Sequence, residues 1–168
     1  VVSEARKRGI WTVLDVIQGA GALPLSFRRL GADAVCGGSH KWMAAPVGVG
    51  YLLIREDRAC ELRPHSVGAH TFGTSEDLPD SSRAPRSDAL RFEAGSKQVL
   101  EIVALGASAA LLHEVGIPAI SAEVLRLSQV LADGLRLLGY VVAVPNGLLQ
   151  KSGIVNFKPG ERSPLKSI

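Results

Sequence analysis

The chain has 168 residues, of which 46% are hydrophobic and 21% charged, and its mean hydropathy is +0.20. This composition is typical of a globular domain and argues against disorder or low complexity. The net charge is +3 with a pI near 9.1, but the basic residues are scattered along the chain, so we expect no nucleic-acid partner.

Cysteine and methionine usage gives further expectations. Cys36 and Cys60 are too few for a disulfide framework, and no basic-apolar signal segment opens the sequence, so we expect a cytoplasmic protein with no membrane partner. The only methionine is Met43, so the sequence does not begin with Met, and we expect a piece of a longer chain. His65 and His70 share a loop without a third ligand at a fixed spacing, and we predict no metal site.

The first third of the chain predicts three strands of one sheet. Trp11–Val16 is a short apolar run typical of a buried strand. A Gly-Ala-Gly turn and a short helix at Ser26–Leu30 lead to a second strand at Ala34–Cys36, and this connection is long enough for a parallel crossover. Val49–Ile54 follows too soon for another crossover, so we predict that it is antiparallel and that the sheet is mixed.

The rest of the chain predicts a long loop, two helices and a second unit. Pro64–Leu90 is rich in Gly, Ser, Pro and Asp and predicts a functional loop. Ser96–Val115 is apolar nearly all round and predicts a buried core helix. A second helix is predicted from Pro118 to a cap at Gly139. Its apolar stripe consists of Ile120, Val124, Leu127, Leu131, Leu135 and Leu138. The segments 140–144 and 154–157 predict two strands of a smaller unit.

Candidate chemistry gathers where the two parallel strands end. Ligands of open α/β sheets bind outside the carboxyl ends of the strands, and there the sequence brings together Asp15, Gln18, Ser39, His40 and Lys41. A lysine can form a Schiff base with an aldehyde cofactor, while a carboxylate holds the cofactor's pyridine nitrogen protonated. The Gly-Gly-Ser-His turn before Lys41 suits a phosphate group. The alternative interpretation is a tight exit from strand to loop.

Five segments stand in an order that carries a family resemblance. They are Val13–Gly21, Gly31–Asp33, Gly38–Trp42, Ala45–Leu52 and Arg91–Ser96. Together they resemble class V aminotransferases, the pyridoxal-phosphate (PLP) enzymes that include cysteine desulfurases and isopenicillin-N epimerase-like proteins. The resemblance implies an α/β fold of the fold-type-I PLP-dependent transferase kind, with a mixed, mostly parallel sheet, helices and the start of a small α+β domain. Residues 1–116 would be the C-terminal half of the large cofactor-binding domain, and residues 117–168 a linking helix and the beginning of the small domain.

The resemblance also assigns roles to three residues around the cofactor ring. Lys41 would be the catalytic lysine that forms the Schiff base and then moves the proton at the substrate α-carbon. Asp15 would pair with the pyridinium nitrogen, and Gln18 would donate a hydrogen bond to the phenolic oxygen. Trp42 is expected to pack beside the loop that carries Lys41.

Three further residues would bind the phosphate. Ser39 and His40 match loop positions that contact the phosphate of the same subunit. Ser96 matches a residue that, in related dimers, reaches the phosphate bound by the other subunit, which implies a homodimer. Lys97 and Gln98 stand where a Pro-Asn pair is more familiar, a departure beside Ser96.

The predicted function is that of a PLP-dependent enzyme, or a fragment of one, that acts on the amino group or the α/β-carbon of an amino acid. Residues of the family that lie outside this sequence decide between transamination, epimerisation and desulfuration. The alternative is a non-catalytic truncated fragment that serves as a folding or interaction module.

Overall fold

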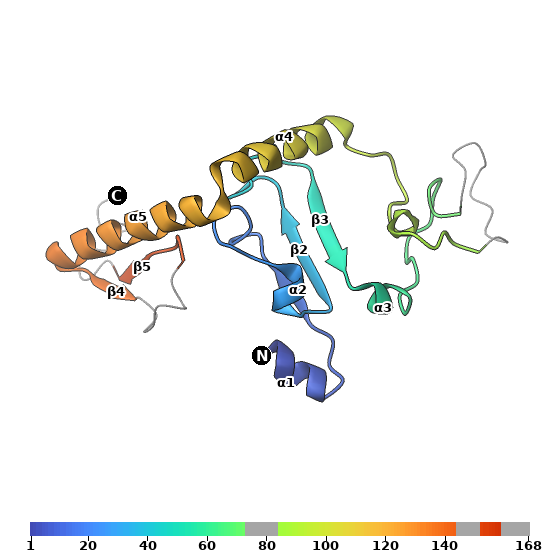
Figure 1. Cartoon of the computed structure of the whole chain (residues 1–168), viewed down its shortest axis with the longest axis horizontal. Coiled ribbons are helices and arrows are strands. Elements are labelled where there is room, and N and C mark those ends of the chain that lie inside the picture. Colours follow the sequence, from blue (N-terminus) through green and yellow to red (C-terminus); the bar gives the residue numbers. More distant parts are fainter. Residues whose placement is uncertain (73–83, 144–151, 159–168) are drawn as a thin grey trace, which may run out of the picture.

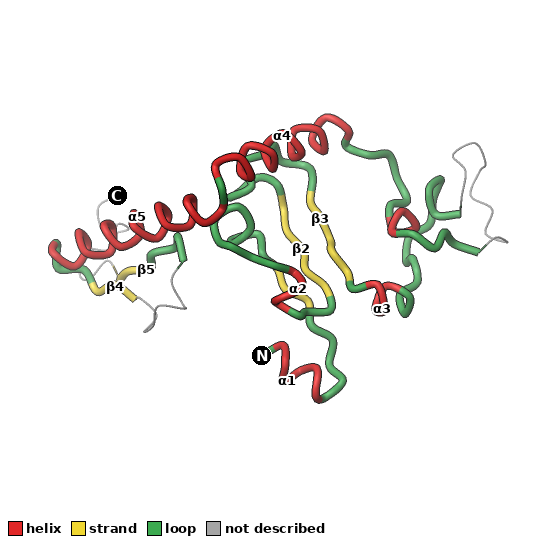
Figure 2. Tube along the Cα trace, in the orientation of Figure 1, coloured by secondary structure: helices red, strands yellow, loops and turns green. Residues whose placement is uncertain are grey.

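A computed structural model of the chain describes residues 1–72, 84–143 and 152–158 (Figure 1). The elements in chain order are α1 (Val2–Lys7), β1 (Val13–Asp15), α2 (Phe27–Leu30), β2 (Ala34–Gly38), β3 (Gly50–Ile54), α3 (Glu56–Ala59), the 3-10 helix η1 (Ala89–Phe92), α4 (Val99–Val115), α5 (Ile117–Leu137), β4 (Val141–Ala143) and β5 (Asn156–Lys158). Figure 2 shows the sheet of β1, β2 and β3 in one part of the molecule and the pair β4–β5 beside α5 in another.

The three-stranded sheet has the predicted directions. Its order is β1-β2-β3, with β1 parallel to β2 and β3 antiparallel to β2. Asp15 is opposite Cys36, and Gly37 is opposite Tyr51. The predicted helix between β1 and β2 is present as α2, where the Ser26 hydroxyl accepts a hydrogen bond from the Arg29 N–H and Gly31 ends the helix at φ +67°. The mixed sheet is therefore confirmed.

Asp33 fixes the end of the sheet at which β2 begins. The residue is only 4% exposed, and its Oδ2 accepts hydrogen bonds from the N–H and hydroxyl of Thr12 at 2.9 and 3.0 Å. Its Oδ1 accepts from Arg58 Nε at 2.9 Å and from Arg55 Nη1 at 3.3 Å. The Thr12 N–H bond, followed by the Arg58 bond, lowers the pKa of Asp33 from 3.8 to about 2. This carboxylate is saturated with donors and joins β1, β2 and α3.

The prediction that the first long helix is a buried core helix is wrong for the described chain. α4 forms at Val99–Val115, but none of its residues is buried, and Leu100 is 82% exposed. The helix crosses the sheet at the end toward which β2 points (Figure 1). A three-stranded sheet can cover only part of the surface of a helix that is apolar nearly all round. Apolar composition predicted the helix correctly but did not identify what covers it.

The second long helix, α5, and the strands β4 and β5 lie together in the described chain, and we call these three elements the second unit. α5 begins after Gly116, where φ is +88°, and its axis lies at 82° to that of α4. β4 and β5 pair antiparallel, with Val142 opposite Phe157, and Tyr140 packs edge-on against Phe157 with ring centroids 5.4 Å apart. Both predicted strands are confirmed. The bend coincides with the predicted boundary after residue 116, and the division into two domains stays a prediction.

The predicted apolar stripe of α5 is only partly covered. Leu127, Leu131 and Leu138 are 52%, 53% and 75% exposed, whereas the buried positions of the helix are the small residues Ser121 and Ala132. Within the described ranges no single helix has the length and apolar character needed to cross a membrane, and α4 and α5 meet that test only when the bent pair is taken together.

Candidate cofactor site

The ends of β1 and β2 bring the predicted site residues to one edge of the sheet. β1 ends at Asp15, and β2 ends at Gly38, immediately before Ser39, His40 and Lys41. Because the two strands are parallel, these positions share the edge that faces α4 in Figure 1. Gln18 follows in the turn after β1, and its side chain is exposed. The structure therefore brings five of the six predicted site positions to the same edge.

Asp15 combines a fixed carboxylate with a free oxygen. Its Oδ1 accepts a hydrogen bond from the Ile17 N–H at 2.9 Å, which turns the chain directly after β1. The residue is exposed, and among the described residues no hydrogen bond is made to its Oδ2. The carboxylate is held in place and still has an oxygen with which to bind a protonated group.

Lys41 lies in a loop that closes on itself, which we call the lysine loop (residues 39–49). Ser39 is fully buried, and its hydroxyl donates a hydrogen bond to the carbonyl of Pro46. The Ser39 N–H donates to Val49 O at 3.1 Å, and the Ala45 N–H donates to Ser39 O at 3.1 Å. The loop is pinned at its base, while Lys41 itself is exposed. The structure gives the Ser39 hydroxyl this closing role, and its phosphate contact stays a prediction.

The backbone of the two residues that follow Lys41, Trp42 and Met43, is held from two further elements. Gly21 has φ +94°, and a Cβ at this position would lie 2.2 Å from the Trp42 carbonyl oxygen and 3.0 Å from the Met43 nitrogen. On α4, the Ser108 hydroxyl donates a hydrogen bond to the Met43 carbonyl. Gly21 thus allows the turn after β1 to approach the lysine loop closely, and Ser108 connects the same loop to α4. The Gly-Ala-Gly turn signalled Gly21, whereas nothing local signals Ser108.

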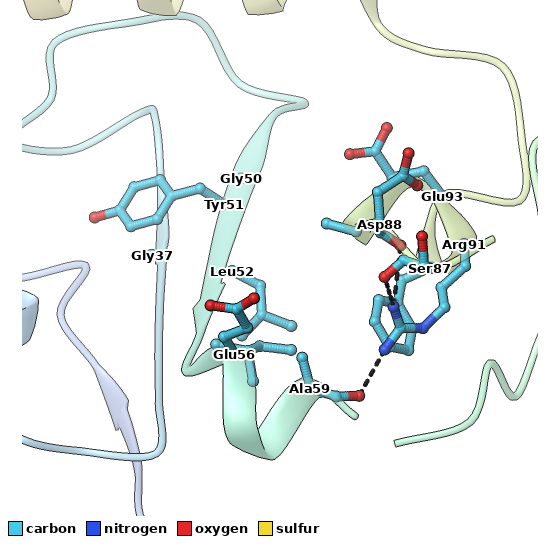
Figure 3. Close-up of a pocket in the computed structure, with 13 residues that line it drawn as sticks. Gly37, Gly50, Tyr51, Leu52, Glu56, Ala59, Ser87, Asp88, Arg91 and Glu93 are labelled. Atoms are coloured by element: carbon cyan, nitrogen blue, oxygen red, sulfur yellow. Dashed lines mark hydrogen bonds between the residues drawn. The ribbon is translucent and has the colours of Figure 1, made fainter. Parts of the chain in front are cut away.

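Glycines in β2 leave room for side chains that pack across the strand. A Cβ at Gly37 would lie 2.4 Å from the Tyr51 hydroxyl oxygen, and one at Gly38 would lie 2.9 Å from Ile17 Cδ1. Figure 3 shows the Tyr51 ring extending from β3 toward Gly37. Burial raises the pKa of the Tyr51 phenol above its ordinary value, and the charges of Cys36 and Asp15 act in the same direction. The two glycines before the lysine therefore have a packing role.

A cavity of about 810 Å³ lies between β3 and the segment that contains η1 (Figure 3). Arg91 borders it and is 8% exposed. Its Nη1 donates to Ser87 O at 2.6 Å and to Asp88 O at 3.2 Å, and its Nη2 donates to Ala59 O at 2.6 Å. The guanidinium thus ties this segment to the end of α3. None of the predicted site residues lines the cavity, so it is separate from the candidate cofactor site.

Ser96 lies apart from the other predicted site residues along the chain, in the segment that leads into α4. It is exposed, and the adjoining segment is held by an ion pair between Lys97 Nζ and Glu93 Oε2 at 3.0 Å. Its predicted ligand is a phosphate in a partner subunit, and that contact stays a prediction.

Comparison with known proteins agrees with the family resemblance of the five sequence segments. The sequence model of the family described as "Aminotransferase class-V" matches residues 1–164. The chain belongs to the class V aminotransferase family. It is 32% identical over its whole length to a probable cysteine desulfurase of Aeropyrum pernix, of which it covers 39%. The family resemblance of the five sequence segments is confirmed.

Solved structures support the same assignment and the fold. The apo structure of a cysteine desulfurase from Thermococcus onnurineus NA1 matches 98% of this chain and 40% of that chain, with a TM-score of 0.87 at 25% identity. A variant of C-DES with glycine covalently linked to its PLP cofactor matches 84% of this class V chain, and 36% of its own, with a TM-score of 0.73 at 28% identity. The fold is that of fold-type-I PLP-dependent enzymes. The chain spans about two fifths of the length of these relatives.

Proposed function

We propose that this class V chain is the part of a PLP-dependent enzyme that holds the cofactor-binding lysine and carboxylate, and that the enzyme acts on the amino group or the α/β-carbon of an amino acid. The observation that carries the proposal is the placement of Asp15 and Lys41 at the carboxyl ends of two adjacent parallel strands. Membership of the class V family and the similarity to a PLP-linked structure support it.

The residues at this edge fit the chemical groups of PLP. The free oxygen of Asp15 suits a protonated pyridine nitrogen, and the exposed Lys41 offers a primary amine for an aldehyde. Exposed donors on Gln18 and His40 are available for the phenolic oxygen and the phosphate. This donor set contains a partner for each polar part of the cofactor.

The chain's own residues then have distinct roles. Bound PLP supplies an electron-withdrawing ring that stabilises negative charge at the carbon next to the substrate nitrogen. The Asp15 carboxylate keeps the proton on the ring nitrogen, and the hydrogen bond from Ile17 keeps that carboxylate oriented. The Lys41 amine would hold the cofactor through its aldehyde and, when not so engaged, would move a proton at the substrate α-carbon. The hydrogen bonds that close the lysine loop would restrict the position of the Lys41 backbone.

A homodimer and a cytoplasmic location belong to the same proposal. The exposed position of Ser96 before α4 leaves its hydroxyl available to a second subunit, in keeping with the role that the family resemblance implies. Cys36 and Cys60 are both free thiols, which suits a reducing compartment. Cross-linking and sedimentation of the purified protein test the dimer.

The direct test is chemical modification at Lys41. PLP added to the protein is expected to give a visible absorption band, and borohydride is expected to fix the cofactor to Lys41 in preference to the exposed Lys7. Lys41→Arg, which keeps the charge but removes the primary amine, should abolish both signals. Equal modification of Lys41 and Lys7, in this chain and in a longer protein that contains it, would overturn the proposal.

The exposed surface of α4 favours a second candidate, a module that folds or interacts without the cofactor. Leu100 and Val103 are 82% and 65% exposed, which is typical of a surface that another polypeptide covers. Under this alternative PLP leaves the melting temperature unchanged. Under the enzyme proposal PLP raises the melting temperature, because a ligand that binds only the native state stabilises it.

A further inference from the structure

Trp42, the residue directly after Lys41, connects the lysine loop to the second unit. A Cβ at Gly153 would lie 2.8 Å from Cζ2 and 2.9 Å from Cη2 of the Trp42 indole. The same Cβ would lie 2.9 Å from Cγ1 of Val124 on α5. Only a residue without a side chain fits between the indole and α5 in this arrangement.

The backbone that directly follows this indole is also held closely. Gly21 contacts the Trp42 carbonyl, and Ser108 donates a hydrogen bond to the next carbonyl, that of Met43. The indole is rigid, and close-packed groups transmit displacements to their neighbours. A shift of Gly153 toward these groups therefore displaces either Val124 or the indole of Trp42, the residue next to Lys41.

We propose that Trp42 is a positioning residue that couples residues 152–158 and α5 to the position of Lys41. Movement of the second unit, for example when an amino-acid substrate binds, would then displace the Trp42 side chain and thereby shift the Lys41 amine. The part of this inference that concerns the reactivity of Lys41 rests on the proposed function. The mechanical link between Gly153 and the lysine loop is independent of the proposed function.

The test is Gly153→Ala in the full chain, with Gly134→Ala as the matched control. Gly134 lies on α5, and a Cβ there has no atom within 4 Å, so the control makes the same substitution without a clash. Two quantities are measured: amide hydrogen exchange of peptides that cover residues 39–49, and the share of PLP that borohydride fixes at Lys41. For Gly153→Ala we expect exchange in the lysine loop to become about threefold faster or more, and the Lys41 share to fall by a similar factor. Gly134→Ala should change neither.

The outcomes separate this inference from the proposed function. Unchanged exchange in the lysine loop of Gly153→Ala overturns the coupling, whatever happens at Lys41. Faster exchange with an unchanged Lys41 share shows that Trp42 does not position the amine, which also overturns it. If wild-type Lys41 is not modified preferentially while exchange responds, the proposed function fails and the mechanical link stands.

A second variant guards against a general loss of folding. Trp42→Phe replaces the indole with a smaller ring and makes room for the added methyl group of Gly153→Ala. The double variant is therefore expected to return lysine-loop exchange toward that of Trp42→Phe alone. If the double variant exchanges as fast as the sum of the two single effects predicts, the two positions are independent and the inference is wrong.

Discussion

Gly21 offers a direct test of how the lysine loop is supported. Gly21→Ala places a methyl group at φ +94°, 2.2 Å from the Trp42 carbonyl oxygen and 2.6 Å from the Trp42 carbonyl carbon. Carbon and carbonyl oxygen rarely come closer than about 3.3 Å. The Trp42–Met43 peptide and the turn at Gly21 therefore have to move apart by about 1 Å.

Two costs contribute to the expected loss of stability. A left-handed backbone costs an alanine about 1–2 kcal/mol. Forcing a methyl group against packed backbone costs about 1–3 kcal/mol more. We expect the free energy of unfolding to fall by about 2–5 kcal/mol in total.

Gly9→Ala separates the two costs. Gly9 has φ +68°, but a Cβ there has no atom within 4 Å, so this variant carries the backbone cost without the contact. Urea unfolding monitored by circular dichroism gives both free energies. Gly21→Ala should be the less stable variant by about 1–3 kcal/mol. Equal losses in the two variants would refute the claim that Gly21 supports the lysine loop through close backbone contact.

Three further predictions concern single side chains. Ser108→Ala removes the hydrogen bond to the Met43 carbonyl and should lower the free energy of unfolding by about 1 kcal/mol. Ser128→Ala removes a hydrogen bond to Val124 O within one helix and should lower it by less in the same urea measurement. The folded-state pKa of Asp33 is about 2, so its contribution to stability is present above its unfolded pKa of about 4 and is lost as the pH falls toward 2. The difference in unfolding free energy between wild type and Asp33→Asn should therefore shrink between pH 4 and pH 2. A difference that stays constant over this interval would contradict the prediction. Leu100→Lys should change the free energy of unfolding by less than about 0.5 kcal/mol, because Leu100 is 82% exposed, and a large loss would mean that α4 is covered in solution.

The sheet and the edge that carries Asp15 and Lys41 were predictable because their signals are local. The short apolar runs before Asp15 and Gly37 mark strands, and the length of each connection decides whether the next strand is parallel or antiparallel. These two facts are enough to place Asp15 and Lys41 at one edge. Strand ends were less accurate: β2 extends through Gly37 and Gly38, since glycine removes a side chain without removing the backbone hydrogen bonds of the ladder.

The supports of the lysine loop were not predictable, because they depend on contacts between distant positions. Ser108 and Met43 are 65 residues apart, and no sequence pattern links a serine on an apolar helix to a carbonyl in a loop. The helix α3 was missed for a similar reason. Arg58 lies in this four-residue helix and Arg55 directly precedes it, and their role becomes evident only from the ion pairs that both make with Asp33.

The two aspartates at opposite ends of the parallel strands differ in how many hydrogen bonds they already accept within the described chain. Asp33, where β2 begins, accepts hydrogen bonds at both oxygens from Thr12, Arg55 and Arg58, so it has no capacity left for another group. Asp15, where β1 ends, accepts one bond that orients it and keeps the other oxygen available within the described chain. A ligand that brings its own proton on a ring nitrogen can pair only with the second kind of carboxylate. The rigid end therefore keeps the strands in register, and this register brings the free oxygen of Asp15 and the amine of Lys41 to the same edge.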